Sequence, residues 1–270
     1  MERRIIDIHT HIYPATLARR AMKVAGREQD AYEKLPVLEN LLAGMKREKI
    51  AVSAVLHVAS RPDTQRDVNR FADESRRTNL LPFGAFHPDC AHPMEELERL
   101  KDKNMAGVKF HPPFQRVCLD DEKYTEIWKR INKLGFAVLI HCGQARTPRR
   151  FDLYPSGVAK IIRFLPDVPV ILAHMGGRSG DGKEEKILYA LPENVYIDTA
   201  MSAVFQDPAD FYRIAAAFGP NRVLFGSDFP YGDQGAAIAY IENSPFSEHE
   251  KAMMLGQTAY KLIGKSIRTR

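Results

Sequence analysis

The sequence has few cysteines and no long apolar run, and both features limit the kind of protein that it can be. Its 270 residues include three cysteines, which are widely spaced and form no Cys-x-x-Cys motif. Such cysteines provide no disulfide framework and favour a reducing compartment. No apolar run approaches the roughly 20 residues of a membrane span, and the charged first four residues lead into a strand pattern rather than a signal-peptide core. We therefore expect a cytoplasmic protein without a membrane partner.

Basic residues are in slight excess, but no strongly basic segment is present. Lys and Arg total 39 against 34 for Asp and Glu, which gives a formal net charge of +5. Because the basic residues are scattered, this excess indicates a mild preference for anionic ligands and gives little support to nucleic acid binding. We expect a small-molecule substrate and no nucleic acid partner.

Eight short apolar segments, each followed by a helical pattern, predict the fold. The predicted strands span residues 5–11, 51–59, 81–88, 105–111, 136–142, 168–174, 195–198 and 222–228. Apolar strands that alternate with helices are typical of a parallel sheet covered by helices, and eight such units over about 250 residues close into a (β/α)8 TIM barrel. We therefore predict one α/β domain over residues 1–270. A doubly wound open sheet is the alternative, but no glycine-rich phosphate loop follows the first strand.

Residues 12–35 lack a clear apolar period. They are polar and contain Pro14 and a charged cluster, so we expect a loop over the active site or a solvated excursion. In contrast, the apolar residues of segment 124–134 recur at helical spacing and predict an amphipathic helix that ends at Gly135.

The first predicted strand ends in two histidines, His9 and His11, separated by one residue. Side chains at i and i+2 of a strand point to the same face, so both imidazoles can bind one metal ion. A catalytic zinc-type site needs about three protein ligands and one open position. Because this two-histidine pattern also occurs by chance, two surface histidines are the simpler interpretation unless the chain supplies further ligands.

Most other candidate residues also lie at predicted strand ends. In sequence order the candidates are His9, His11, Lys109, His111, His141, His174 and Asp228. In a barrel the carboxyl ends of the strands meet at one mouth, where active sites are built. The chain has only nine histidines, and a random scatter would rarely produce this arrangement. The pattern therefore predicts an active site rather than polar ends of buried strands.

Five motifs along nearly the whole chain carry a family resemblance. They are IDIHTH, GVKFHP, LIHCG, ILAHMGG and LFGSDFP. In this order they resemble the amidohydrolase superfamily, and within it the amidohydrolase-2 branch that includes aminocarboxymuconate-semialdehyde decarboxylase. Segment 255–262 also resembles the closing helix of that family, although Thr258 stands where the family usually has asparagine.

The resemblance implies a set of metal ligands and an acid or base. It implies that His9, His11, His141 and Asp228 bind a divalent metal, and that His174 lies beside the metal-bound water. Such a ligand set leaves an open position, and the ion would lower the pKa of bound water to about 7. Asp228 could then accept a proton, while His174 could stabilise the developing charge or protonate the leaving group. We expect zinc, with manganese as the alternative.

Lys109 has two candidate roles. In binuclear members of the superfamily a lysine of the fourth strand is carbamylated and bridges two metals, whereas the single-metal branch has no such bridge. We prefer one metal, with Lys109 as a cation that orients a substrate carboxylate. Arg146 and Arg178 are candidates for substrate contact, since loops at the mouth shape substrate choice and guanidinium groups bind carboxylates. His111 either supports the metal ligands or contacts the substrate.

Two reactions fit this site. The first expectation is metal-dependent hydrolysis of a C–N, C–O or lactone bond in a small, carboxylate-bearing substrate. The alternative is non-oxidative decarboxylation of an aromatic or dienoic acid. A TatD-like deoxyribonuclease is disfavoured because Lys109 stands where that branch has glutamate. A barrel that only binds a ligand is disfavoured because it would retain a complete acid–base set without chemistry. A homo-oligomer is compatible with the sequence, which does not indicate the contact surface.

Overall fold

The computed structural model describes residues 4–27, 29–145, 149–177 and 182–268. Eight parallel strands form one sheet in sequence order. They are β1 (Ile5–Thr10), β2 (Ile50–Leu56), β3 (Leu80–Ala85), β4 (Gly107–Phe110), β5 (Ala137–Ile140), β6 (Val170–Leu172), β7 (Val195–Asp198) and β8 (Val223–Leu224). All eight predicted strands are therefore present.

Hydrogen bonds between the β8 segment and β1 close the sheet. The amide of Ile8 donates to the carbonyl of Phe225 at 2.9 Å, and the amide of Asp228 donates to the carbonyl of His9 at 2.8 Å. Because the last strand segment pairs with the first, the sheet is a barrel rather than an open, doubly wound sheet. The predicted TIM barrel is confirmed.

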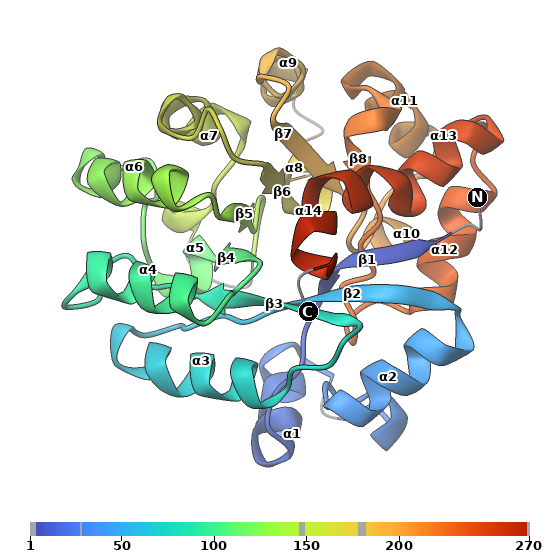
Figure 1. The fold of residues 1–270 in the computed structure, drawn as a ribbon. Coiled ribbons are helices and arrows are strands. Elements are labelled where there is room, and N and C mark those ends of the chain that lie inside the picture. Colours follow the sequence, from blue (N-terminus) through green and yellow to red (C-terminus); the bar gives the residue numbers. More distant parts are fainter. Residues whose placement is uncertain (1–3, 28, 146–148, 178–181, 269–270) are drawn as a thin grey trace.

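Helices surround the barrel, and the last helix lies across one of its ends (Figure 1). They are α1 (Ala15–Val24), α2 (Leu38–Arg47), α3 (Gln65–Glu74), α4 (Pro93–Asp102), α5 (Pro112–Gln115), α6 (Thr125–Leu134), α7 (Pro155–Ile161), α8 (Ala173–Gly177), α9 (Gly182–Ala190), α10 (Ser202–Phe205), α11 (Pro208–Phe218), α12 (Gln234–Glu242), α13 (Glu248–Ala252) and α14 (Thr258–Arg268), with the π-helical turn η7 (Met253–Gln257) before α14. As predicted, α6 ends at Gly135, whose φ of +72° suits a residue without Cβ. No helix in the described ranges is long and apolar enough to cross a membrane.

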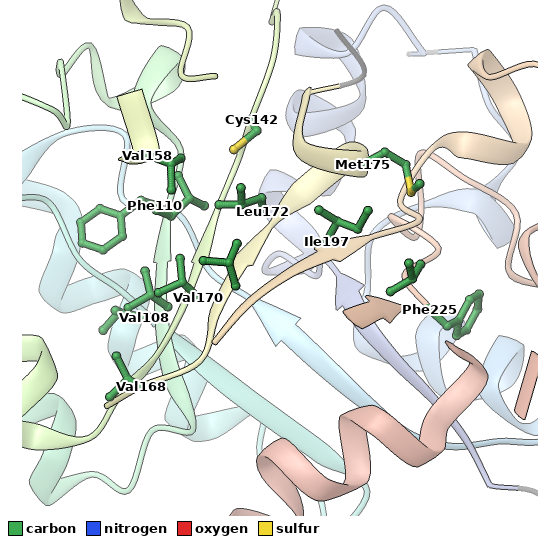
Figure 2. Close-up of a cluster of buried hydrophobic side chains, with 14 of the residues drawn as sticks. Val108, Phe110, Cys142, Val158, Val168, Val170, Leu172, Met175, Ile197 and Phe225 are labelled. Atoms are coloured by element: carbon green, nitrogen blue, oxygen red, sulfur yellow. The ribbon is translucent and has the colours of Figure 1, made fainter. Parts of the chain in front are cut away.

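Alternating side chains of the strands form two apolar layers. The outer layer lies between strands and helices, and Figure 2 shows part of it, including Val108, Phe110, Val170, Leu172 and Ile197. The inner layer fills the barrel and includes Leu81, Phe83, Leu139, Ile171 and Leu224. Cys142 belongs to the outer layer, and burial raises the pKa of its thiol. This alternation directs the side chains at odd positions of β4 and β5, including Lys109, toward the barrel axis.

Helix α1 is an element that the sequence pattern did not predict. It buries Ala18 and Met22, which pack with Leu35 and Val37 in a small separate cluster. The expectation of an irregular segment over residues 12–35 was therefore wrong. The helix gives no clear apolar period in the sequence because only one of its turns contributes buried residues.

Helix α14 covers the amino-terminal end of the barrel. Its residues Ala259 and Ile263 belong to the inner apolar layer. In η7, a Cβ added at Gly256 would overlap the carbonyl oxygen of Arg4, just before β1 begins, so the chain passes directly against the start of that strand. With this end covered, the carboxyl ends of the strands are the end where side chains can meet a ligand.

Candidate active site

The predicted site residues lie at the carboxyl end of the barrel, but several of them lie beyond the strands. His9 and Lys109 are within β1 and β4, whereas the other candidates of the described chain follow a strand by one to four residues. The largest difference is at β8, which ends at Leu224, four residues before Asp228. Short strands followed by irregular segments allow these side chains to turn toward one another.

An irregularity in β1 directs His9 toward the mouth. Between Asp7 and Thr10 the register against β2 shifts by one residue, which is the pattern of a β-bulge. Ile8 packs in the inner layer, and the extra residue interrupts the alternation so that His9, the next residue, also reaches the mouth. Simple alternation correctly placed His9 and His11 together, but it could not predict the bulge.

Five of the predicted residues meet in one cluster, in which His9, His11, His174 and Asp228 are buried and His141 is partly buried. His9, His174 and Asp228 offer ligand atoms that lie within 4.8 Å of one another. Oδ1 of Asp228 lies 3.5 Å from Nε2 of His9 and 3.3 Å from Nε2 of His11. Yet this oxygen, like Nε2 of His141, has no hydrogen-bond partner within the described chain. Buried polar atoms without partners are rare, and a cation between these atoms would satisfy them, so the residues present fit a metal.

Hydrogen bonds orient the first two imidazoles for metal binding. Nδ1 of His9 lies 2.7 Å from Oδ2 of Asp198, and Nδ1 of His11 lies 2.8 Å from the carbonyl of Leu56. Since both oxygens accept, each Nδ1 carries the proton and each Nε2 keeps a lone pair. A histidine whose second nitrogen donates to an oxygen is the usual arrangement in a metal site.

The same hydrogen-bond reasoning shows that His141 and His174 differ in whether their Nε2 atom is free to bind a metal. Nδ1 of His174 lies 3.1 Å from the carbonyl of Ala200, so it donates, and Nε2 of His174 then accepts from Nδ1 of His141 at 3.0 Å. Nε2 of His141 therefore keeps a free lone pair, whereas Nε2 of His174 is engaged. Burial lowers the pKa of both imidazoles, as it does for His9, which favours the neutral form that metals bind.

Asp198 at the end of β7 is a functional candidate that the sequence analysis missed. Besides holding His9, it accepts hydrogen bonds at Oδ1 from the amides of His174 (2.8 Å) and Ala200 (3.0 Å). His174 has a φ of +58° and Met175 one of +55°, so α8 is in fact a left-handed turn. Such a conformation costs about 1–2 kcal/mol per non-glycine residue, and the Asp198 hydrogen bond helps to hold it. An acidic residue at the end of a buried strand was the signal that could have identified it.

Lys109 is fully buried, and its amine has no hydrogen-bond partner in the part of the chain that the structure describes. Burial lowers the pKa of this amine to about 8, although the carboxylates of Asp198 and Asp228 act in the opposite direction. This value lies close to neutral pH, so both the charged and the neutral amine are accessible at this position.

His111 lies beside the cluster. Its ring stacks between those of Phe114 and His141, with centroid distances of 3.9 Å on both sides. This contact supports the orientation of His141. The other two candidates for substrate contact, Arg146 and Arg178, lie outside the described residues, so their role stays a prediction.

Gly226 makes room for His9. A Cβ at this position would lie 2.8 Å from Cβ of His9. We expect Gly226→Ala to shift His9 or the segment after β8 and thereby to weaken metal binding. The fold should be destabilised by about 1–3 kcal/mol, as is typical of overpacking. Thermal unfolding and chelator competition would measure both effects. Gly182→Ala is the control, because no atom of the described residues lies within 4 Å of its added Cβ. Equal effects of both variants would contradict the explanation.

Comparison with known proteins establishes the family. The sequence model described as amidohydrolase matches residues 6–265. The chain belongs to the amidohydrolase family. The recognition made from the five motifs is thereby confirmed, and this amidohydrolase is an enzyme.

Relatives of the amidohydrolase cover almost its whole length. A 6-methylsalicylic acid decarboxylase of Aspergillus aculeatus is 24% identical over 314 residues, which cover 92% of this chain and 90% of the relative. The 5-carboxyvanillate decarboxylase of Sphingomonas paucimobilis has a TM-score of 0.73 at 16% identity and covers 97% of this chain and 99% of its own. A dihydroxybenzoic acid decarboxylase of a Polaromonas species, solved with manganese and the inhibitor 2-nitroresorcinol, also has a TM-score of 0.73 at 16% identity and covers 97% of both chains. At such identity the structural likeness establishes the fold.

Proposed function

We propose that this amidohydrolase catalyses the non-oxidative decarboxylation of a small aromatic acid at a divalent metal site. The observation that carries the proposal is that a relative named as an aromatic acid decarboxylase aligns with 92% of this chain. This chain also has the cluster of His and Asp residues at the mouth of its barrel. Hydrolysis was the first expectation from the sequence, and the relatives favour the alternative. We further propose that residues 1–270 act as one catalytic domain.

The proposed ligands are His9, His11, His141 and Asp228. Their support is the hydrogen-bond pattern, which leaves a lone pair on Nε2 of each histidine. The fourth is the carboxylate of Asp228, whose Oδ1 faces Nε2 of His9 at 3.5 Å and Nε2 of His11 at 3.3 Å. Three imidazoles and a carboxylate suit zinc, and manganese is bound in the Polaromonas relative, so we propose zinc or manganese.

Decarboxylation breaks the bond between the ring carbon and the carboxylate carbon, releases carbon dioxide and requires one proton at the ring carbon. A bound divalent ion would supply positive charge that binds substrate oxygen atoms and withdraws electron density. Lys109 would orient the substrate carboxylate through its buried cation. His174 would take up a proton at Nε2 and deliver it to the ring carbon, while its Nδ1 stays held by Ala200. Because Nε2 accepts from Nδ1 of His141 in this structure, that hydrogen bond would open when the proton is taken up.

The two reactions are separated by their products. We expect the metal-loaded enzyme, given a panel of hydroxybenzoic acids that includes 6-methylsalicylic acid, to release labelled carbon dioxide from the carboxyl-labelled substrate. In heavy water the product should gain one deuterium at the carbon that lost the carboxylate. Incorporation of labelled oxygen from water into an amide, ester or lactone substrate, without release of carbon dioxide from any member of the panel, would instead support hydrolysis. The cytoplasmic location and the homo-oligomer stay predictions.

A further inference from the structure

Asp7 is a fully buried carboxylate two residues before His9. Its Oδ1 accepts hydrogen bonds from the backbone amides of Ser227 (3.0 Å) and His9 (3.2 Å). Its Oδ2 accepts from the hydroxyl of Ser227 (2.6 Å) and from Nε2 of Gln234 (3.4 Å). One side chain thus receives four hydrogen bonds, of which one comes from the proposed ligand His9 and two come from Ser227.

These hydrogen bonds join the two segments that carry ligands. Ser227 directly precedes Asp228, and its hydroxyl also accepts from the amide of Phe229 at 3.0 Å. The Asp7–Ser227 pair therefore holds the backbone on both sides of Asp228. Asp228 itself has a φ of +63°, a conformation that a residue with a Cβ adopts when its surroundings hold it there.

We propose that Asp7 is a positioning residue that sets the distance between the metal-binding atoms of His9 and Asp228. The inference rests on the proposed function, because it takes these two residues as ligands. Asparagine reproduces the contact only in part, because it has one acceptor oxygen in place of two. Its amide group would face the Ser227 hydroxyl or the Gln234 amide, and that group would lose the acceptor for its proton. Loss of a residue that orients a metal ligand typically weakens metal affinity about 10–100-fold.

The test removes the same contact from either side. Asp7→Asn and Ser227→Ala should each weaken zinc or manganese affinity about 10–100-fold, measured by competition with a chelating dye and therefore independent of turnover. The double variant should be little weaker than the more affected single variant, because both changes remove one shared interaction. If Asp7→Asn fails to fold, Ser227→Ala still tests the contact.

The control is another buried polar residue that joins two elements. The side chain of Asn69 in α3 pairs with both the amide (2.8 Å) and the carbonyl (2.9 Å) of Ala85 in β3. Asn69→Leu should lower the thermal unfolding midpoint but leave metal affinity within a few-fold of wild type. Wild-type affinity in both Asp7→Asn and Ser227→Ala, or an equal loss in Asn69→Leu, would overturn the role of Asp7. Failure of the wild type to bind either ion would instead contradict the proposed function.

Discussion

Replacing His11 by alanine is expected to reduce the metal content from about one ion per chain, the number that a three-histidine and one-carboxylate site holds, to nearly none. The variant loses the Nε2 atom that lies 3.3 Å from Oδ1 of Asp228, so the ion keeps too few ligands. The measurement is plasma mass spectrometry on protein purified without chelators. Circular dichroism should show that the barrel is retained, because the inner and outer apolar layers are unchanged.

The matched control for this loss is His92→Ala, since the side chain of His92 is 63% exposed and its Nδ1 lies 3.8 Å from a carboxylate oxygen of Glu95 rather than in the cluster. It should retain the wild-type metal content. An unchanged content in His11→Ala would remove His11 from the ligand set. Two ions per wild-type chain would indicate a second metal and would favour a carbamylated Lys109 as a bridge over the role of a free cation.

The second large effect is expected from His174→Asn. Asparagine can accept the hydrogen bond from Nδ1 of His141 but cannot transfer a proton near neutral pH. Loss of a positioned acid or base typically costs about 10²–10⁴-fold, so kcat should fall in this range while the metal content stays at the wild-type level. Release of carbon dioxide at saturating substrate, together with metal analysis of the same sample, would measure both.

His87→Asn is the control for the loss of a buried histidine at the mouth. His87 is only 3% exposed, but its Nε2 contacts the carbonyl of Gln115 at 3.2 Å rather than the cluster. Its kcat should stay within a few-fold of wild type. Retained turnover in His174→Asn would exclude His174 from proton transfer. Loss of metal in that variant would make His174 a ligand, as its closeness to His9 and Asp228 also allows.

Much of the fold and of the candidate site could be predicted from local pattern. Buried parallel strands have continuous apolar runs, so all eight were predicted, and their carboxyl ends indicated His9, His141 and Asp228. The limits of the strands were less accurate, because the apolar run continues into residues that leave the sheet. Helix α1 was missed because its buried face is only one turn long, which is too short to give an apolar period in the sequence.

The sequence by itself determined the barrel, the end at which the side chains gather and the residue types available for a metal. These follow from apolar period and chain order, which are local properties. Only the tertiary structure decided which nitrogen of each imidazole is free, that Asp198 orients His9, and that Asp7 joins β1 to the segment of Asp228. These contacts link residues 189 and 220 positions apart, and no local pattern records which distant donor will meet a buried acceptor.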